Sequence, residues 1–281
     1  MKQGEANMQF GIHLPQAGDQ ASPTKIRRAA LQAEDSAVTD VWVSDHVILP
    51  NGASYPPSPL FYDPVVTLTW VAAVTKRVRL GTSVMVLPMR HPLPLAREFG
   101  TLQDYSEGRV ILGAGVGWCE EEFSALGVPF KERGRRMDEG MALMRAVWSH
   151  DPVTFPTKYI SANVMDMRMT PLPKVRIPFW IGGVADAQIR RTIEQADGWH
   201  GSRQTPAEAA PFIQRIRAAR PEPEFTISMR VRWDGTDIGA LRDRVAEFAA
   251  VGVQHIMVEP NSRETDDWDA VIEGTIKVAA G

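Results

Sequence analysis

The sequence predicts a (β/α)8 TIM barrel, a domain in which eight parallel strands alternate with helices and close into a ring. Apolar runs typical of strands alternate with helical patterns over most of the chain, and this alternation indicates a parallel sheet. The length of 281 residues suits one large α/β domain. A glycine pair follows a late strand and precedes a helix, which is typical of a phosphate site in this fold.

Eight segments have the apolar character of strands, and we expect them to form the barrel: residues 8–13, 40–43, 78–86, 109–113, 179–181, 198–201, 225–232 and 255–258. Helices are expected between them. Three of these helices share one start signal, a capping side chain followed by proline at the first helical position: Ser22-Pro23, Asp63-Pro64 and Thr205-Pro206. Over residues 135–148 methionines recur at helical spacing, and we interpret this stripe as core packing.

Two stretches break the alternation of strands and helices. Residues 49–62 are rich in proline, serine and glycine and are expected to form a loop after the second strand. Residues 151–177 contain many prolines and show no helical period, so they form either an inserted excursion or a degenerate connection. Long loops at the mouth of a barrel often cover the active site, and we expect the insertion near the C-terminal mouth.

Composition argues against several classes of function. The net charge of −3 gives no reason to expect a nucleic acid or an anionic membrane surface as partner, and no apolar run approaches the ~20 residues that span a bilayer. The single cysteine, Cys119, rules out an internal disulfide. Residues 1–7 are polar and lack the apolar core of a signal peptide. We therefore expect a cytoplasmic protein with a disordered extension at 1–7 and a single domain at 8–281.

Asp45 and His46 follow the second expected strand directly, at the face of a barrel where catalytic groups lie. A histidine at this position can donate a proton or stabilise charge near neutral pH. The alternative is that Asp45 caps nearby backbone and that His46 packs beside it. His13 ends the first strand at the same face, where it either lines a substrate pocket or has a structural role.

Two glycine-rich turns are further candidates for ligand binding. The first, from Gly113 to Gly117, does not fit the dinucleotide fingerprint because its third glycine comes one residue early, so a Rossmann dehydrogenase is not expected. The second, at residues 182–185, precedes a helical run whose free N–H groups suit phosphate. The scattered histidines and the lone cysteine indicate no metal site. The sequence has no Gly-x-Ser-x-Gly elbow to indicate a hydrolase.

Two stretches of the chain carry a family resemblance, and their motifs are Ser106-Glu-Gly-Arg-Val-Ile-Leu-Gly-Ala-Gly-Val-Gly-Trp118, Glu121-Glu-Phe123, Leu126-Gly-Val128, Arg133-Gly134, Ile177-Pro-Phe-Trp-Ile-Gly-Gly183 and Ala196-Asp-Gly-Trp199. In these motifs the chain resembles the luciferase-like monooxygenase superfamily, in its branch of F420-dependent oxidoreductases. The resemblance covers roughly residues 8–280. It implies a (β/α)8 barrel that binds either coenzyme F420, a deazaflavin, or FMN at its C-terminal mouth.

The resemblance also implies roles for residues at the ends of the barrel strands. Asp45 would contact the polar edge of the deazaflavin ring, and His46 would lie beside its reactive carbon as a proton donor or charge stabiliser. Ser83 and Val84 would form a bulge with a cis peptide bond behind the ring. The full set of cofactor-binding residues implied in this way is Asp45, Ser83, Val84, Val116, Gly117, Gly182, Gly183, Val184, Ala185 and Ser202.

One departure from the family pattern concerns the substrate. Sugar-phosphate dehydrogenases of this family place a catalytic glutamate just after the glycine turn, where this chain has Trp118. A glucose-6-phosphate reaction is therefore not expected, and a pocket lined by Trp118 and His13 favours a less polar small molecule. The resemblance favours hydride transfer with F420 by a homodimer. The alternatives are an FMN-dependent monooxygenase and a flavin-binding barrel without turnover.

Overall fold

The computed structural model describes residues 8–53, 58–261 and 267–281, and it confirms the predicted barrel. The strands run parallel in one sheet of order β3-β2-β1-β11-β10-β9-β8-β5-β4, which closes because β3 also pairs with β5. The expected extension at residues 1–7 lies outside the described part of the chain. The barrel strands are β1 (Gln9–His13), β2 (Asp40–Val43), β3 (Arg79–Thr82), β4 (Met85–Val86), β5 (Val110–Gly115), β8 (Phe179–Gly182), β9 (Gly198–Ser202), β10 (Thr226–Trp233) and β11 (His255–Pro260).

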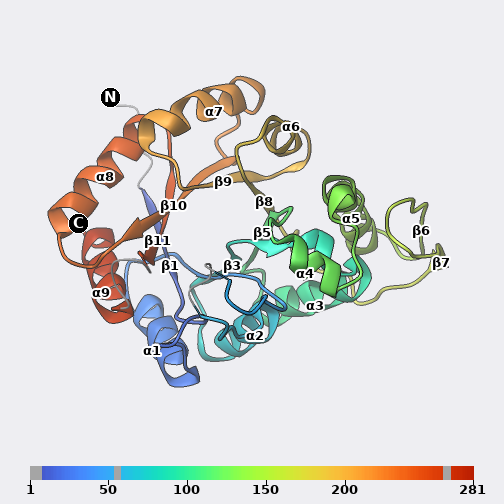
Figure 1. Cartoon of the computed structure of the whole chain (residues 1–281), viewed down its shortest axis with the longest axis horizontal. Coiled ribbons are helices and arrows are strands. Elements are labelled where there is room, and N and C mark those ends of the chain that lie inside the picture. Colours follow the sequence, from blue (N-terminus) through green and yellow to red (C-terminus); the bar gives the residue numbers. More distant parts are fainter. Residues whose placement is uncertain (1–7, 54–57, 262–266) are drawn as a thin grey trace.

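Helices between the strands cover the outside of this ring (Figure 1). Ser22 and Asp63 cap α1 and α2 with side-chain oxygens, and Thr205 begins α7 with a capping box. Proline occupies the first turn of each of these helices, as the sequence predicted. The long helices are α1 (Pro23–Glu34), α2 (Pro64–Val74), α3 (Pro92–Tyr105), α5 (Arg133–Ser149), α6 (Asp186–Gln195), α7 (Pro206–Ala219), α8 (Ile238–Ala250) and α9 (Trp268–Ala279).

Large side chains fill the barrel interior where a glycine leaves room for them. Trp42, Ile111, Trp180 and Met257 form a buried cluster inside the ring. A Cβ atom at Gly81 would lie 2.3 Å from the Trp42 ring, so the strand can pass Trp42 only without a side chain at this position. The interior is therefore a packed core rather than a channel.

The strand expected over residues 78–86 is interrupted. Its two halves are β3 and β4, and the peptide bond between Ser83 and Val84, which separates them, is cis. The first half pairs with β2 and β5, and the second half pairs with β5 alone. The bulge with a cis peptide bond that the family resemblance implied at this position is confirmed.

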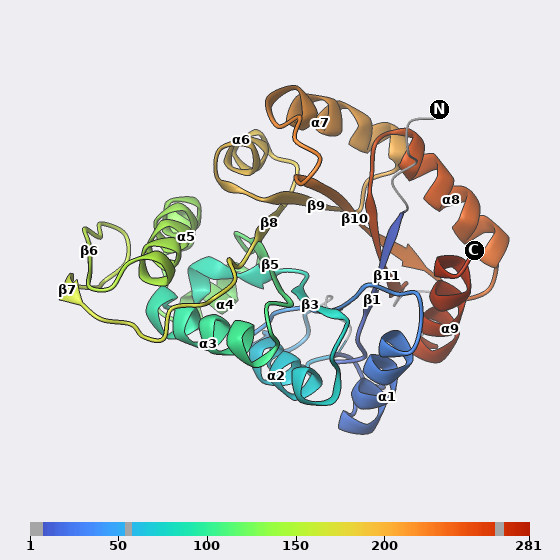
Figure 2. The ribbon, with the colours of Figure 1, turned by 180° about the vertical axis from the view of Figure 1, so that it is seen from behind.

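The proline-rich stretch between α5 and β8 is an inserted excursion. It contains an antiparallel hairpin of β6 (Val153–Phe155) and β7 (Val164–Met167), which projects beyond α5 in both views (Figures 1 and 2). Glu139, in the N-terminal half of α5, accepts hydrogen bonds from the N–H groups of residues 158, 159 and 160. The excursion is therefore anchored on the half of α5 that begins at the barrel mouth.

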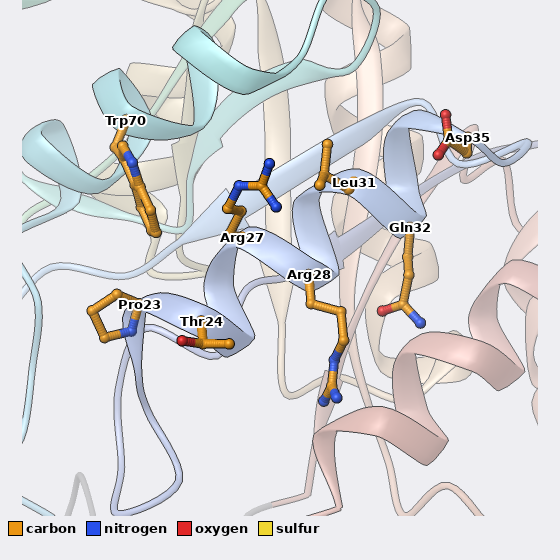
Figure 3. Close-up of a pocket in the computed structure, with 8 residues that line it drawn as sticks. All are labelled: Pro23, Thr24, Arg27, Arg28, Leu31, Gln32, Asp35 and Trp70. Carbon is orange, nitrogen blue, oxygen red and sulfur yellow. The ribbon is translucent and has the colours of Figure 1, made fainter.

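A cavity of about 540 Å³ lies on the outer wall, between α1 and α2 (Figure 3). Arg27 and Leu31 of α1 and Trp70 of α2 are among the residues that line it. All its lining residues belong to these two helices or to the residue that follows α1, so this cavity is separate from the barrel mouth. In the described part of the chain, no helix has the length and apolarity needed to cross a membrane.

Candidate active site

The carboxyl ends of the parallel strands bring the candidate residues to one face of the barrel. His13 ends β1, His46 follows β2, and Ser83 separates β3 from β4. Residues 116–118 follow β5, residues 182–185 lie at the end of β8, and Ser202 ends β9. Because all these strands run in the same direction, their C-terminal ends form the mouth that the fold uses for chemistry.

His46 is held by a carboxylate that the sequence did not single out. Its Nδ1 lies 3.0 Å from Oε2 of Glu122, in the first turn of α4 (Glu120–Ala125). The same carboxylate accepts hydrogen bonds from the backbone N–H groups of Val47 and Ile48 at 2.5 and 3.2 Å. With Nδ1–H donated to Glu122, Nε2 of His46 has no hydrogen-bond partner among the described residues. The imidazole is therefore oriented, and its second nitrogen is available to a ligand.

Glu122 is suited to this role by its surroundings. Burial opposes ionisation of its carboxyl, but the hydrogen bonds from His46, Val47 and Ile48 lower the pKa of Glu122 below its usual value. Its neighbours Glu120 and Glu121 are exposed, whereas Glu122 is buried. The run of three glutamates was visible in the sequence, but nothing local shows that its third member faces inward.

Aromatic rings surround His46 on two sides. Phe61 and Trp118 contact its ring edge-to-face at centroid distances of 5.3 and 5.9 Å. Trp118 is 55% exposed, and Val47 and Ile48 beside His46 are exposed as well. This apolar surface beside an available imidazole nitrogen suits a substrate with an apolar body and one polar reacting group.

Asp45 is buried and links two segments of the chain by hydrogen bonds. Its carboxylate accepts a hydrogen bond from Val86 N at 3.0 Å and two from Arg90, at 2.6 and 3.2 Å. Burial raises the pKa of Asp45, and the contacts with Arg90 and Val86 oppose that rise. Asp45 therefore ties the loop after β2 to the end of β4 and to Arg90 in the segment that follows. Its contact with a cofactor ring remains a prediction.

His13 lies deeper than His46. Its Nδ1 donates to the Leu14 carbonyl at 2.8 Å, and its Nε2 lies 2.8 Å from Oγ of Ser44. Burial, assisted by the nearby Arg230 cation, lowers the pKa of His13 to about 4, so the ring is neutral at pH 7. Both ring nitrogens have protein partners, and a role of His13 in the substrate pocket stays a prediction.

The first glycine-rich segment is part of a strand rather than a turn. The sequence placed the end of the fourth strand at Gly113, but β5 continues to Gly115. A Cβ atom at Gly113 would lie 1.8 Å from the Thr82 carbonyl oxygen, and one at Gly115 would lie 2.6 Å from the Val84 side chain. These two glycines therefore allow β5 to approach the interrupted strand. Gly117, with a φ of 79°, is the one that turns the chain after β5.

The second glycine-rich segment is an open turn. Gly183 has a φ of 103°, and the residue before α6, Ala185, offers no side chain to cap the helix. Gln188 and Trp199 donate hydrogen bonds to the carbonyls of Gly182 and Gly183 at 3.2 and 3.1 Å. The first N–H groups of α6 are thus left uncapped at an exposed position, which is the arrangement that binds phosphate.

Ser202, at the end of β9, lies on the strand next to β8. Its backbone N–H donates to the side chain of Gln204 at 3.1 Å, which shapes the chain as it leaves the strand. Ser202 is half-buried. Contact of Ser202 with a cofactor tail stays a prediction.

Two charged residues at the mouth were missed from the sequence. Arg230 of β10 donates to the Ser83 carbonyl oxygen at 2.6 Å and forms an ion pair with Glu259 of β11, which also contacts Arg232 at 2.9 Å. Burial opposes ionisation of Glu259, but Arg230 lowers the pKa of its carboxyl to about 2. The sequence contained a signal for Arg230, because arginine is unusual inside an apolar strand such as Met229-Arg-Val-Arg232.

The described residues hold no group of three or more histidine, cysteine, aspartate or glutamate side chains that could bind a metal ion. Cys119 is buried in front of α4, and burial raises the pKa of its thiol. A raised pKa disfavours the reactive thiolate.

Comparison with known proteins gives consistent matches. A sequence model of the luciferase-like monooxygenase family matches residues 8–272 of this chain. A protein of Mycobacterium tuberculosis without an assigned function is 30% identical over 82% of each chain. An F420-dependent glucose-6-phosphate dehydrogenase of Kineococcus radiotolerans is 34% identical over 65% of this chain and 53% of its own. The solved structure of an F420-dependent secondary alcohol dehydrogenase with an F420–acetone adduct superposes with a TM-score of 0.82, at 18% identity, over 98% of this chain and 99% of its own.

Proposed function

The chain belongs to the luciferase-like monooxygenase family, and we propose that it is an oxidoreductase that transfers hydride between coenzyme F420 and a small organic substrate. The observation that carries this proposal is the pairing of His46 with Glu122, which leaves Nε2 of His46 available at the mouth. A relative with 34% identity is named for an F420-dependent reaction, which supports the choice of cofactor.

The residues at the mouth fit an elongated cofactor that carries a phosphate. The open turn at Gly183 and the uncapped start of α6 would hold the phosphate, and the segments at Ser83–Val84 and Val116–Gly117 would border the ring. A Cβ atom at Gly183 would lie 3.1 Å from Gln188, so a side chain would crowd this turn. When bound, F420 supplies the group that donates or accepts hydride, and the protein supplies binding and orientation.

His46 would handle the proton at the substrate oxygen. Glu122 fixes the tautomer through Nδ1, so that Nε2 accepts or donates the proton, and its negative charge stabilises the imidazolium that forms. Phe61 and Trp118 shield the imidazole from water on two sides. Arg230 donates a hydrogen bond to the Ser83 carbonyl and so would keep the segment that borders the ring in place.

We propose an alcohol, ketone, enone or quinone with an apolar body as the substrate class. Trp118, Val47 and Ile48 present apolar surface beside His46. A sugar phosphate would need polar partners at these positions, and Trp118 offers one ring nitrogen only. The 34% identical glucose-6-phosphate dehydrogenase therefore supports the cofactor in this proposal and not the substrate.

We also propose that two copies associate through α2. Its outer face carries Val66, which is 70% exposed, and Trp70, which is 37% exposed, one helical turn apart. Exposed apolar side chains at helical spacing mark protein interfaces, and two-fold dimers are the commonest assemblies. Light scattering should give a dimer that Trp70→Glu weakens. A chain that stays at its monomer mass of 31.1 kDa across micromolar concentrations would contradict this proposal.

An anaerobic titration with F420, FMN and FAD, followed by fluorescence, tests the cofactor. We expect F420 to bind more tightly than either flavin. Binding of FMN alone would favour the alternative of an FMN-dependent monooxygenase. Binding of F420 without turnover of any alcohol, enone or quinone would favour a flavin-binding barrel that has no catalytic role.

A further inference from the structure

Three polar residues form a row across neighbouring strands of the barrel interior. In the register of the sheet, His200 of β9 and His255 of β11 both pair with Ser228 of β10. Oγ of Ser228 lies 2.7 Å from Nδ1 of each histidine. All three residues are almost fully buried. A row of this kind is unusual, because barrel interiors are mainly filled by branched apolar side chains.

The row continues at both ends. Nε2 of His255 lies 2.7 Å from Oδ1 of Asp40 on β2, and Nε2 of His200 lies 2.8 Å from Oγ of Ser83 at the mouth. Asp40 reaches His255 across β1 because Gly11 lies between them, where a Cβ atom would come within 2.1 Å of Oδ1. We call Ser83, His200, Ser228, His255 and Asp40 the polar relay.

The chemistry of Asp40 sets the direction of every hydrogen bond in the polar relay. Asp40 accepts hydrogen bonds from Thr39, Trp42, Arg79 and His255, and although burial opposes ionisation, His255 and Arg79 hold its pKa well below its usual range. The carboxylate is therefore ionised, and His255 donates to it through Nε2–H.

The remaining directions follow one from another. With a proton on Nε2 alone, His255 is neutral and its Nδ1 must accept from Ser228. Ser228 then accepts from Nδ1–H of His200, and Nε2 of His200 accepts from the Ser83 hydroxyl. In this state all donors of the polar relay are directed from the mouth toward Asp40. Oγ of Ser83 also accepts a long hydrogen bond from Arg230 at 3.4 Å, and it has one further acceptor position.

We propose that the polar relay takes a proton from a ligand N–H or O–H group at Ser83 and stores it on His255, beside the Asp40 carboxylate. The ligand proton bonds to Oγ of Ser83, whose own proton moves to Nε2 of His200. Nδ1–H of His200 passes to Ser228, whose former proton moves to Nδ1 of His255. The ligand keeps the electron pair of its broken bond, and His255 becomes an imidazolium paired with Asp40. No other reactant is required.

The surroundings favour His255 over His200 as the place of storage. Burial and the nearby Arg230 cation lower the pKa of His200 to about 3, and a cationic His255 lowers it as well, so His200 passes a proton on rather than keeping it. His255 instead contacts the ionised carboxylate of Asp40 directly. When His255 stores the proton, the direction of each hydrogen bond between His255 and Ser83 is reversed. The Ser83 hydroxyl then becomes a donor at the mouth. The charged groups around the polar relay are Asp40, Arg79, Arg230 and Glu259.

NMR of the protein labelled with ¹⁵N-histidine tests the polar relay without any cofactor. At neutral pH we expect His255 to carry its proton on Nε2 and His200 on Nδ1. On acidification His255 should become a cation, and the His200 proton should move to Nε2 at the same pH. The proposal fails if His200 carries Nε2–H while His255 is neutral, if the two change at different pH values, or if neither changes before the protein unfolds.

The variant Ser228→Ala removes the link between the two histidines. In the folded variant His200 and His255 should titrate separately, and the control Thr275→Val, which deletes a buried hydroxyl in α9, should leave them coupled. Coupled titration in Ser228→Ala would overturn the proposal. If Ser228→Ala does not fold, the titration of the wild-type chain decides.

The mouth end of the polar relay rests on the proposed function, because a cofactor is expected at Ser83. Addition of F420 to the ¹⁵N-histidine-labelled protein at neutral pH should convert His255 to the imidazolium in the wild-type chain and leave it neutral in Ser228→Ala, with no net exchange of protons with the solvent, because the proton comes from the ligand. Binding of F420 that leaves His255 neutral in the wild-type chain would overturn transfer from the ligand. Failure of F420 and FMN to bind would contradict the proposed function and leave the NMR result to decide on the relay itself.

Discussion

The two glycine-rich segments look alike in the sequence but differ in what they allow. In β5, Gly113 and Gly115 face neighbouring protein atoms that a Cβ would strike, at 1.8 and 2.6 Å. After β8, Gly183 has a positive φ and leads to the uncapped, exposed start of α6. A glycine run therefore predicts a close approach, but the sequence does not say whether the approaching group is protein or ligand.

The difference extends to the two halves of the mouth. The segment after β5 leads to Trp118 and Glu122, which surround His46, so we assign this half to the reaction. The segment after β8 offers backbone N–H groups and no titratable side chain inside the turn, so we assign it to cofactor anchoring. Substitutions in the reactive half should lower turnover, and substitutions in the anchoring half should lower affinity.

The largest effect is expected in the reactive half. His46→Ala should lower turnover by about 10²–10⁴-fold, because it removes the proton-handling group, while F420 affinity stays within a few-fold of wild type. Steady-state rates with enones or quinones, together with a binding titration, measure both quantities. Near-normal turnover by a stable variant would remove His46 from the mechanism and leave Asp45 or His13 as the next candidate.

A glycine substitution tests the claim that the first segment packs against protein. Gly113→Ala places a Cβ 1.8 Å from the Thr82 carbonyl oxygen, and overpacking of this kind should lower the free energy of unfolding by about 3 kcal/mol or more. The matched control is Gly140→Ala in α5, where the nearest atom would be 3.8 Å away. Urea unfolding that gives equal stability for the two variants would refute the packing argument.

Acid should lower the stability of the barrel, because buried histidines below both halves of the mouth are held neutral in the folded chain. The pKa of His13 is lowered to about 4 and that of His200 to about 3, from 6.5. The unfolded chain thus binds these protons at a higher pH, so their contribution is complete above pH 6.5 and is lost as the pH falls toward the folded values. At pH 5 the loss should be about 2 kcal/mol per histidine.

Urea unfolding at pH 7 and pH 5 checks this loss of stability. In His13→Gln the loss of stability between pH 7 and pH 5 should be smaller than in the wild-type protein by roughly the contribution of one histidine, because glutamine does not titrate. Equal free energies of unfolding of the wild-type protein at the two pH values would show that these histidines are not held neutral in the folded state. The charged groups that face them are Arg230, Glu259 and Asp40, and the titratable His255 lies beside His200.

The smallest effect is expected in the anchoring half. Gly183→Val should weaken F420 binding about tenfold, since loss of one charge-assisted hydrogen bond corresponds to about 1.5 kcal/mol. Gly252→Val is the matched control, because Gly252 also has a positive φ but lies in the loop before β11, at the opposite end of the barrel. Unchanged affinity of folded Gly183→Val would show that the phosphate lies elsewhere.

Local signals in the sequence were sufficient for the fold. Each barrel strand was visible as an apolar run, and the cap-and-proline pairs at Ser22, Asp63 and Thr205 marked helix starts. These features depend on neighbouring residues only, so a linear pattern contains them. The end of β5 and the break at Ser83 depend on contacts with other strands. The motif resemblance located the break, but the extension of β5 to Gly115 was not foreseen.

The contacts that define the candidate site lie far apart along the chain. His46 and Glu122 are 76 residues apart, and Ser83 and His200 are 117 residues apart. One sequence indicates which residues end strands at the mouth, but it does not indicate which carboxylate turns toward which imidazole. Glu122 and the polar relay therefore became visible only once the barrel had brought their strands together, whereas Arg230 could have been noticed inside its apolar strand.

The most direct test of hydride transfer is an anaerobic single-turnover experiment. Protein loaded with reduced F420 is mixed with an enone or quinone, and the absorbance of the cofactor and the amount of reduced product are followed together. We predict that oxidised F420 appears in step with an equal amount of reduced product, and that His46→Ala slows the appearance of both. If reduced F420 persists with every such substrate, while protein loaded with reduced FMN consumes oxygen and oxygenates a substrate in a parallel aerobic assay, hydride transfer with F420 is contradicted.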